Sequence, residues 1–390
     1  MTRPLLILPV DGPHASEPLD VMALLRQALT ASGPALMPVS DMVVEAGSPA
    51  LFVPRRVAVV IETSGSTDVP KRVMLGTDAL LASAAASADT LGGPGQWLLA
   101  LPTHYIAGVQ VLVRSIVAET IPVVMPPGHF DAQRFMALAE TMSEPLRYTS
   151  LVPVQLSRLL AATDGDSRLL AVLRRFTAIL IGGQAIRPEL SAHAEQLGVR
   201  VVRTYGSSET CGGCVYNGLP IGNTQVRVRD GQLEMSGSVL AEGYLADPER
   251  TADRFIDDHL VRWYRTGDLG EVNSDTGEVR VLGRADNVII SGGEKVSLDA
   301  VERVVRSLSG FSEAVVVAAD DAEWGQVPVV IVAGPHEVCE ASEARSEAGM
   351  RDAVVSSLGR AARPARVVLV PAIPLLPSGK PDRRALAARL

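Results

Sequence analysis

The chain has 390 residues, of which 47% are hydrophobic and 21% are charged, and its formal net charge is -8. This composition is that of a globular protein with two or three domains, and the negative charge gives no electrostatic basis for binding a nucleic acid. Three cysteines are too few for a disulfide framework, and no stretch is apolar for long enough to span a membrane. We therefore expect a cytoplasmic protein without membrane insertion.

The first half of the chain alternates short apolar strands with helical patterns. A strand is predicted at the N-terminus, and others at residues 56–62, 96–102, 120–126, 148–153, 176–183 and 199–206. Helical patterns lie between several of them, as at residues 80–88 and 154–162. This alternation is typical of an α/β fold with a largely parallel sheet covered by helices.

Beyond about residue 220 the pattern changes. Asp230-Gly231 joins two alternating runs, which predicts a β-hairpin within a small β subdomain. After residue 287 we expect a helix at 298–308, strands at 313–320 and 327–334, another helix and a strand at 366–372. Together they form an α+β module of roughly a hundred residues, which is the size of a separate domain.

The segment ETSGSTDVPK, residues 62–71, follows an apolar strand. Its hydroxyl side chains, its glycine and Lys71 could hold a phosphate group, although a serine-rich surface turn would have much the same composition. The segment is not a Walker A motif, because no glycine precedes Lys71 and no serine or threonine follows it.

Cys211 and Cys214 form a C-x-x-C pair in TCGGCVY. A structural zinc ion normally needs four ligands, and no second pair of Cys or His is spaced to complete such a site. We therefore favour two small residues in a tight glycine turn over a metal or redox site.

Four further segments carry groups suited to nucleotide chemistry. In TYGSSETCGG, Glu209 follows a strand and could hold Mg²⁺ on phosphate oxygens. In YRTGDLG, Asp268 could accept hydrogen bonds from two ribose hydroxyls. The segments LGRADNVIISGGEKVSLDAVE and PLLPSGKPDRRAL begin and end the last domain, and the second contains Lys380. Each has a plain alternative, such as a solvated acid or a hairpin turn, but their order and spacing are informative together.

In this order the segments resemble the adenylate-forming superfamily of acyl-CoA synthetases, peptide-synthetase adenylation domains and luciferases. The resemblance implies an α/β protein whose large N-terminal domain, residues 1–285, has mostly parallel sheets covered by helices and a small β subdomain. A mobile α+β C-terminal domain, residues 286–390, would follow. Within the superfamily, LPTHYIAGVQVLVRSI and TYGSSETCGGCVYNG are similar to segments of o-succinylbenzoate-CoA ligases of menaquinone biosynthesis.

The resemblance implies an AMP-forming acid-thiol ligase that uses ATP, Mg²⁺ and CoA. The substrate carboxylate would attack the α-phosphorus of ATP and release pyrophosphate, and the CoA thiol would then attack the acyl-adenylate. Because the carboxylate and the triphosphate are both anions, the protein must mainly neutralise charge and hold them in line. The expected partners are a small carboxylic acid, ATP and CoA, and the sequence leaves open whether the protein is a monomer or a homodimer.

Family motifs also imply the site residues. Lys380 and Arg284 would be catalytic, Glu209 would bind the metal, and Asp286 would be the hinge of the mobile domain. The residues expected at ATP or AMP are Thr63, Ser64, Gly65, Ser66, Thr67, Lys71, Gly182, Gly183, Gln184, Thr204, Tyr205, Gly206, Ser208 and Asp268. The residues expected at the acid or at CoA are His104, Tyr105, Ser207, Ser291, Gly292 and Gly293.

o-Succinylbenzoate has two carboxylates, and only the aliphatic one is activated. The aromatic carboxylate needs a donor, because binding would otherwise bury an unmatched charge. The sequence does not choose among the candidates His104, Arg114, Ser207, Ser208 and Asn217.

Asp68 and Arg72 depart from the family pattern, which has glycine at both positions. Glycine permits positive φ and close approach of the backbone, whereas an aspartate adds repulsion toward phosphate. Asp68 could point outward while Arg72 compensates, help to recruit Mg²⁺, or weaken adenylation. The alternatives to the succinylbenzoate ligase are a ligase for another aryl or fatty acid, an adenylation domain, and a non-catalytic protein that binds acyl-adenylates.

Replacing Asp68 with glycine should lower the KM for ATP. A like charge at about 4 Å costs about 1 kcal/mol in bulk water and about 4 kcal/mol at an effective dielectric constant of 20, so the gain should be roughly one to three decades. Steady-state kinetics with varied ATP measure this change. An unchanged KM would contradict the repulsion argument.

Overall fold

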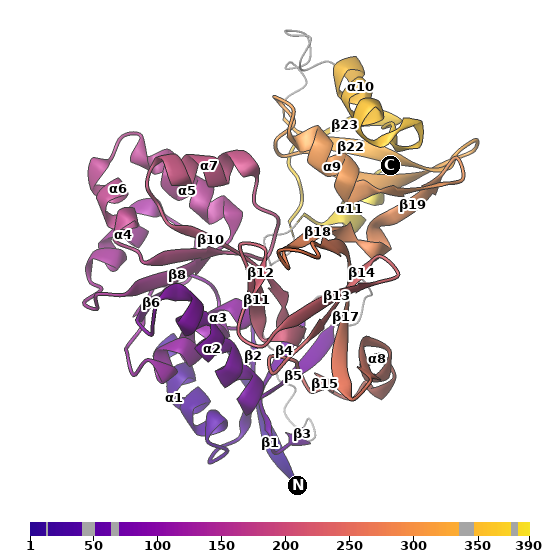
Figure 1. Cartoon of the computed structure of the whole chain (residues 1–390). Coiled ribbons are helices and arrows are strands. Elements are labelled where there is room, and N and C mark those ends of the chain that lie inside the picture. Colours follow the sequence, from indigo (N-terminus) through magenta and orange to yellow (C-terminus); the bar gives the residue numbers. More distant parts are fainter. Residues whose placement is uncertain (13–14, 41–50, 64–69, 335–346, 376–380) are drawn as a thin grey trace. The chain divides into compact units, whose positions relative to one another are not determined.

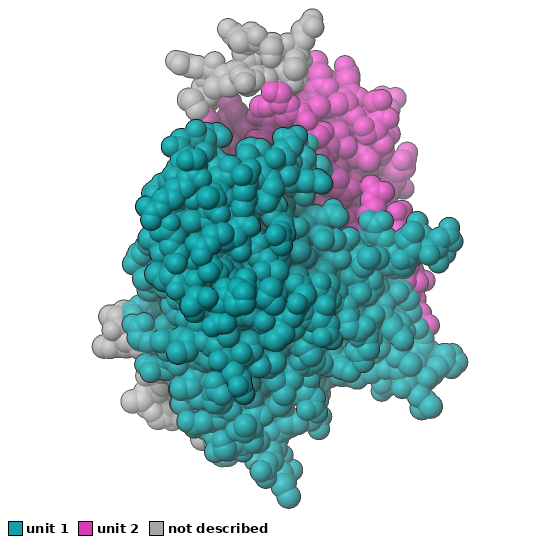
Figure 2. Space-filling model, turned by 60° about the vertical axis from the view of Figure 1, so that its left-hand side comes forward, with its two compact units in different colours: residues 1–227, 234–265, 272–279 teal, residues 228–233, 266–271, 280–390 magenta. Residues whose placement is uncertain are grey.

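The computed structural model describes residues 1–12, 15–40, 51–63, 70–334, 347–375 and 381–390. Two compact units make up the chain (Figure 2). Unit 1 comprises residues 1–227, 234–265 and 272–279, and unit 2 comprises residues 228–233, 266–271 and 280–390. The domain boundary between residues 285 and 286 stays a prediction. No helix in the described ranges is both long and apolar enough to cross a membrane.

A six-stranded mixed sheet in unit 1 contains the two strands between which the predicted phosphate loop runs (Figure 1). Its spatial order is β15-β5-β4-β2-β1-β3. The strands are β1 (Thr2–Pro9), β2 (Ala35–Val39), β3 (Phe52–Pro54), β4 (Val57–Thr63), β5 (Lys71–Gly76) and β15 (Gly243–Tyr244). Strands β1, β2 and β4 are parallel. The apolar run of β4 is buried from Val57 to Ile61, as expected of a central strand.

A seven-stranded sheet in unit 1 has the order β12-β11-β10-β9-β8-β6-β7. Its strands are β6 (Gln96–Leu99), β7 (Val123–Val124), β8 (Arg147–Leu151), β9 (Ala178–Ile181), β10 (Val201–Ser207), β11 (Gly212–Tyr216) and β12 (Leu219–Pro220). The five strands from β10 to β7 are parallel, as predicted. Strands β11 and β12 are antiparallel, because short turns join them to the strands before them.

Three helices lie between these two sheets, namely α1 (Pro18–Leu29), α2 (Thr77–Leu91) and α3 (Ile106–Val117). Helix α1 contacts β2 and β4, α3 contacts β6, β8 and β11, and α2 contacts strands of both sheets. Helices α4 (Ala132–Glu140), α5 (Pro153–Thr163) and α6 (Ser167–Arg174) share a second core with α7 (Pro188–Gln196). Helix α3 is therefore an interior helix, with every residue from Gly108 to Ser115 buried.

A five-stranded sheet follows, with the order β13-β14-β17-β16 and with β18 on β17. The elements of this segment are β13 (Gln225–Arg229), β14 (Gln232–Ser236), α8 (Pro248–Arg254), β16 (Phe255–Asp258), β17 (Val261–Val272), β18 (Val279–Arg284) and the 3₁₀ helix η2 (Ala285–Asn287). The predicted hairpin is confirmed: Asp230 and Gly231 have φ of 52° and 75°, and two positive φ values are what a type I′ turn requires.

The C-terminal part of unit 2 is an α+β module, as predicted. Its sheet has the order β20-β19-β22-β21, and β23 pairs with β22. The elements are β19 (Val288–Ser291), β20 (Glu294–Ser297), α9 (Leu298–Arg306), β21 (Val315–Asp321), β22 (Gly325–Ala333), α10 (Glu347–Leu358), the 3₁₀ helix η5 (Arg360–Ala362), β23 (Arg366–Val370) and α11 (Arg383–Ala387).

Gly108→Ala should destabilise unit 1. A Cβ at Gly108 would overlap the carbonyl oxygen of Pro102 and lie 2.9 Å from that of Leu101. Overpacking of this kind typically costs about 1–3 kcal/mol. Gly165→Ala is the matched control, because its Cβ would meet no atom within 4 Å. Thermal unfolding should show a lower Tm for the first variant alone, and equal Tm values would contradict the packing described here.

Candidate functional site

The predicted phosphate loop connects two antiparallel strands. Thr63 at the end of β4 pairs with Lys71 at the start of β5, so the backbone of both loop ends is held in one register. Arg72 donates a hydrogen bond from Nε to Oε2 of Glu62 at 3.0 Å, in a partly exposed ion pair. The loop residues Ser64, Gly65, Ser66, Thr67 and Asp68 lie outside the described residues. Compensation of Asp68 by Arg72 therefore stays a hypothesis.

The two segments predicted to flank adenine lie side by side. Gly182 and Gly183 follow β9, and Thr204 on the neighbouring strand β10 donates its hydroxyl to the carbonyl oxygen of Ile181 at 3.2 Å. A Cβ at Gly182 would overlap Oγ1 of Thr204, so glycine is required there. Both segments lie at the carboxyl ends of parallel strands, where open α/β sheets usually bind their ligands.

A short turn after β10 carries the predicted metal ligand. This turn is the 3₁₀ helix η1 (Ser208–Thr210), and Oγ1 of Thr210 accepts a hydrogen bond from the backbone N–H of Ser207 at 2.9 Å. The next residue, Cys211, is left-handed with φ of 52°. Its carbonyl oxygen accepts hydrogen bonds from Ser83 on α2 at 3.1 Å and from Nε2 of Gln110 on α3 at 2.8 Å. Two interior helices thus fix the turn.

Cys211 and Cys214 are fully buried free thiols. Burial raises the pKa of both, that of Cys214 to about 12. Within the described part of the chain, no cluster of three or more His, Cys, Asp or Glu side chains could hold a metal ion. The burial of both thiols and their raised pKa favour the packing interpretation of the C-x-x-C pair.

Glu209 is a buried carboxylate, 6% exposed, without a cationic partner among the described residues. Its Oε1 accepts a hydrogen bond from the hydroxyl of Tyr244 at 2.9 Å, and its backbone carbonyl accepts one from Ala241 at 2.8 Å. Burial and the charge of Glu209 raise the pKa of Tyr244, so this hydroxyl stays protonated and donates. Since Mg²⁺ keeps waters and substrate phosphates as most of its ligands, one such carboxylate fits a magnesium site.

Buried polar atoms without a hydrogen-bond partner gather near α3. Of the seven such atoms in the described residues, four are Nδ1 of His104, Oε1 of Gln110, Nε of Arg114 and Oγ of Ser207. Gln110 faces Gly212 on β11, and Gly212 pairs with Ser207. Burial lowers the pKa of His104, and the charge of Asp11 offsets only part of this shift. The neutral imidazole is therefore favoured. Because buried polar groups are rarely without a hydrogen-bond partner, the region around these four atoms is a candidate site for a polar ligand.

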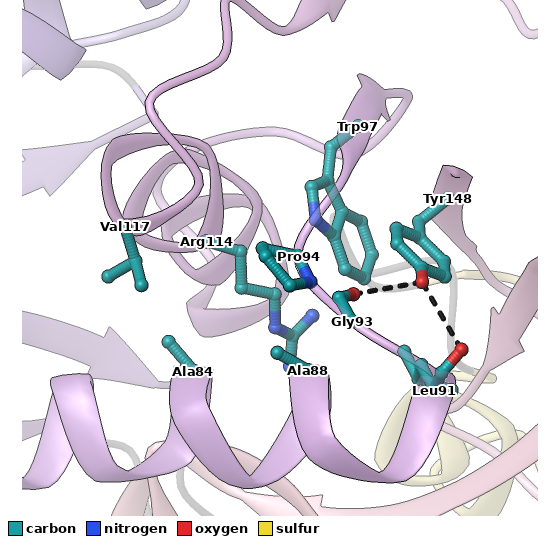
Figure 3. Close-up of a pocket in the computed structure, with 9 residues that line it drawn as sticks. All are labelled: Ala84, Ala88, Leu91, Gly93, Pro94, Trp97, Arg114, Val117 and Tyr148. Carbon is teal, nitrogen blue, oxygen red and sulfur yellow. Dashed lines mark hydrogen bonds between the residues drawn. The ribbon is translucent and has the colours of Figure 1, made fainter. Parts of the chain in front are cut away.

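Arg114 is a buried guanidinium, 7% exposed, for which the described residues supply no carboxylate. Its Nη2 donates to the hydroxyls of Ser87 at 3.0 Å and Tyr216 at 3.4 Å, and the guanidinium lies 4.8 Å from the ring centroid of Trp97. Figure 3 shows it between helix α2 and Pro94. The cavity beside it measures about 20 Å³, enough for roughly one water-sized group.

Arg3 is the informative contrast to Arg114. It is equally buried, at 6% exposed, but its three nitrogens all donate to backbone carbonyl oxygens of Val57 and Ala28. Arg3 therefore has the hydrogen bonds of a structural residue, whereas Nε of Arg114 has no hydrogen-bond partner among the described residues.

In unit 2, the structure brings together three predicted residues. Nη1 of Arg284 donates to Oδ1 of Asp268 at 3.1 Å and to the carbonyl oxygen of Thr266 at 3.2 Å. Nε and Nη2 of Arg284 each donate to Asp286 at 3.1 Å. Burial alone would lower the pKa of Arg284, but its hydrogen bonds and ion pairs with Asp286 and Asp268 raise it. The guanidinium therefore links the predicted ribose ligand to the predicted hinge.

The remaining predicted residues lie in strands or in the turns beside them. His104 and Tyr105 precede α3, with ring centroids 4.1 Å apart. Gly292 and Gly293 form the β19–β20 turn with φ of 57° and 85°, and the buried hydroxyl of Ser291 has no hydrogen-bond partner in the part of the chain that the structure describes. Gln184, Tyr205, Gly206 and Ser208 follow β9 or lie in β10 and η1. Lys380 lies outside the described residues.

The two buried thiols should be chemically inert in the native protein. In a Cys339→Ala variant only Cys211 and Cys214 remain. At neutral pH a thiol whose pKa is raised this far is almost wholly protonated and does not act as a nucleophile. A thiol reagent should therefore react only after unfolding in denaturant, and the variant should not retain zinc. Rapid reaction of the native protein would contradict the packing interpretation.

Sequence comparisons match both parts of the chain. The AMP-binding enzyme family matches residues 11–245, and the AMP-binding enzyme C-terminal domain matches residues 300–380. A probable 2-succinylbenzoate-CoA ligase from Mycobacterium tuberculosis (strain H37Rv) is 40% identical over 341 residues, covering 85% of this chain and 84% of that protein. The 2-succinylbenzoate-CoA ligase of Escherichia coli (strain K12) is 31% identical over 355 residues, covering 86% and 73%.

A structural comparison agrees on the fold. The o-succinylbenzoate CoA synthetase from Bacillus subtilis, in complex with an acyl-adenylate intermediate, matches with a TM-score of 0.74 and 24% identity over 94% of this chain and 80% of that chain. At this identity the likeness establishes the α/β architecture alone.

Proposed function

The chain belongs to the AMP-binding enzyme family, and we propose that it is an AMP-forming 2-succinylbenzoate-CoA ligase of menaquinone biosynthesis. The observation that carries the proposal is the 40% identity, over 85% of the chain, to a protein named for that activity. The buried Arg114, for which the described residues supply no carboxylate, supports it independently, because an acid with two carboxylates needs a second cationic contact.

In the first half-reaction, one carboxylate oxygen attacks the α-phosphorus of ATP, and the bond to pyrophosphate breaks. We place the adenine beside Gly182 and Thr204, and the ribose hydroxyls at Asp268. Glu209 would hold Mg²⁺, which neutralises charge on the phosphate oxygens. Lys71 and Lys380 would supply further positive charge, the latter on the carboxylate and α-phosphate.

Among the candidates for the second carboxylate, we choose Arg114. His104 favours its neutral form, and Oδ1 of Asn217 already accepts a hydrogen bond from the backbone of Arg203 at 2.9 Å. The cavity of about 20 Å³ holds roughly one water-sized group, so only an oxygen of the ring carboxylate would enter it and reach the guanidinium. The rest of the acid would lie along Gln110 toward Ser207.

In the second half-reaction, the CoA sulfur attacks the acyl carbon and AMP leaves. We assign the turn formed by Ser291, Gly292 and Gly293 to the pantetheine arm, with Tyr105 at the entrance and rotation of the C-terminal part about Asp286. CoA binding, this rotation, a cytoplasmic location and the choice between monomer and homodimer all stay predictions.

The test is pyrophosphate release by the purified protein with Mg-ATP, CoA and a panel of carboxylic acids, with mass analysis of the thioester. We expect pyrophosphate and a CoA adduct with o-succinylbenzoate. A thioester with a different aryl or fatty acid alone would contradict the assigned substrate. Failure of every acid to release pyrophosphate would contradict ligase activity and leave a protein that only binds acyl-adenylates.

Arg114→Met should weaken binding of the dicarboxylic acid selectively. Removing one partner of a buried charge pair typically costs at least about 2 kcal/mol, so the KM for o-succinylbenzoate should rise roughly 30-fold or more. The KM for ATP should not change.

The control substrate is 4-oxo-4-phenylbutanoate, which lacks the ring carboxylate. Its kinetics should differ little between wild type and Arg114→Met, because the substitution removes no contact with it. An equal loss with both acids would show that Arg114 is structural.

A further inference from the structure

One segment of unit 1 is hydrogen-bonded both to Glu209, the predicted metal ligand, and to β5, the strand that follows the predicted phosphate loop. We call residues 241–245 the bridging segment. At its start, the N–H of Ala241 donates to the carbonyl oxygen of Glu209 at 2.8 Å. Further along, Tyr244 on β15 pairs with Val73 on β5, and the N–H of Leu245 donates to the carbonyl oxygen of Arg72 at 2.8 Å.

The side chain of Tyr244 completes the connection. It is 3% exposed, and its hydroxyl donates to Oε1 of Glu209 at 2.9 Å, while the hydroxyl of Tyr264 is also its hydrogen-bond partner. Its backbone N–H donates to Oγ1 of Thr251 at 2.9 Å, and its ring centroid lies 5.9 Å from that of Phe255. Ring and hydroxyl are thus held on several sides.

Arg262 fixes the backbone of the bridging segment. Its guanidinium donates to the carbonyl oxygens of Ala241 at 2.6 Å and Glu242 at 3.0 Å. Glu242 also forms an ion pair with Arg56 at 2.6 Å. The bridging segment is therefore held by Arg262 and Arg56 as well as by its contacts with Glu209 and β5. Its position does not depend on Glu209, so it can serve as a rigid support for that carboxylate.

We propose that Tyr244 is a positioning residue for magnesium, because its hydroxyl fixes the orientation of the Glu209 carboxylate relative to the strand that ends the phosphate loop. Because Oε1 accepts the hydrogen bond from the tyrosine, Oε2 would be the oxygen left to hold the ion. This inference rests on the nucleotide part of the proposed function and is independent of which acid the protein activates.

Hydrogen-bonded partners of metal-ligating carboxylates act through ligand orientation. Without the hydroxyl, the carboxylate of Glu209 could rotate, and Oε1 would be buried with no donor. Loss of such a partner typically weakens metal binding by about 10- to 100-fold. Phenylalanine keeps the ring that packs against Phe255, so Tyr244→Phe removes only the hydrogen bonds of the hydroxyl with Glu209 and Tyr264.

The experiment measures Mn²⁺ binding by electron paramagnetic resonance in the presence of a non-hydrolysable ATP analogue. We expect the Kd for Mn²⁺ to rise at least about tenfold in Tyr244→Phe. Binding of the analogue without metal should match wild type. The matched control is Tyr148→Phe, since Tyr148 is also buried and donates its hydroxyl to backbone carbonyls of Leu91 and Gly93.

The outcomes separate this inference from the proposed function. If Tyr244→Phe binds Mn²⁺ as wild type does, or if Tyr148→Phe loses as much affinity, the positioning role is wrong while the proposed function stands. If the wild-type protein binds no Mn²⁺ with the nucleotide, both the positioning role and the nucleotide part of the proposed function are wrong.

Discussion

Two buried charges without a partner of opposite sign among the described residues constrain the arrangement of unit 1. They are the carboxylate of Glu209 and the guanidinium of Arg114. A protein gains no stability from burying an unpaired charge, so other groups must hold each one in place. Hydroxyls do this for both, with Tyr244 at Glu209, and Ser87 and Tyr216 at Arg114. In the proposed function, Mg²⁺ supplies the opposite charge for Glu209, and the ring carboxylate of the acid supplies it for Arg114.

The turn at Cys211 keeps these two charges in a fixed relation. Cys211 follows η1, the 3₁₀ helix that contains Glu209, and leads into β11, which ends at Tyr216 beside Arg114. Because Ser83 on α2 and Gln110 on α3 hold the carbonyl of Cys211, the helix that carries Arg114, α3, also helps to set the direction of the turn. Gly206 leaves no space for a larger residue, because its Cβ would overlap the carbonyl oxygen of Gly212. Rigidity here fits a site that must hold two anions in line.

The sequence was sufficient for the strands of the largely parallel core, the hairpin at Asp230 and the α+β module, because each depends on local periodicity and turn chemistry. It did not predict the antiparallel edges, which depend on how short connections reverse the chain. Family motifs named Glu209 but not Tyr244, which lies 35 residues away, or Ser83, which lies 128 residues from Cys211. Contacts over such separations leave no periodic pattern, and only the folded chain shows them.

The most direct test of this account is the melting temperature of Glu209→Gln, with and without Mg-ATP. A glutamine can still accept the hydrogen bond from Tyr244 but carries no buried charge. We predict that the ligand-free variant melts at or above the temperature of the wild type, and that Mg-ATP no longer raises its Tm as it does for wild type. A ligand-free variant that melts several degrees lower, with an unchanged response to Mg-ATP, would show that the carboxylate serves the fold and not the ion.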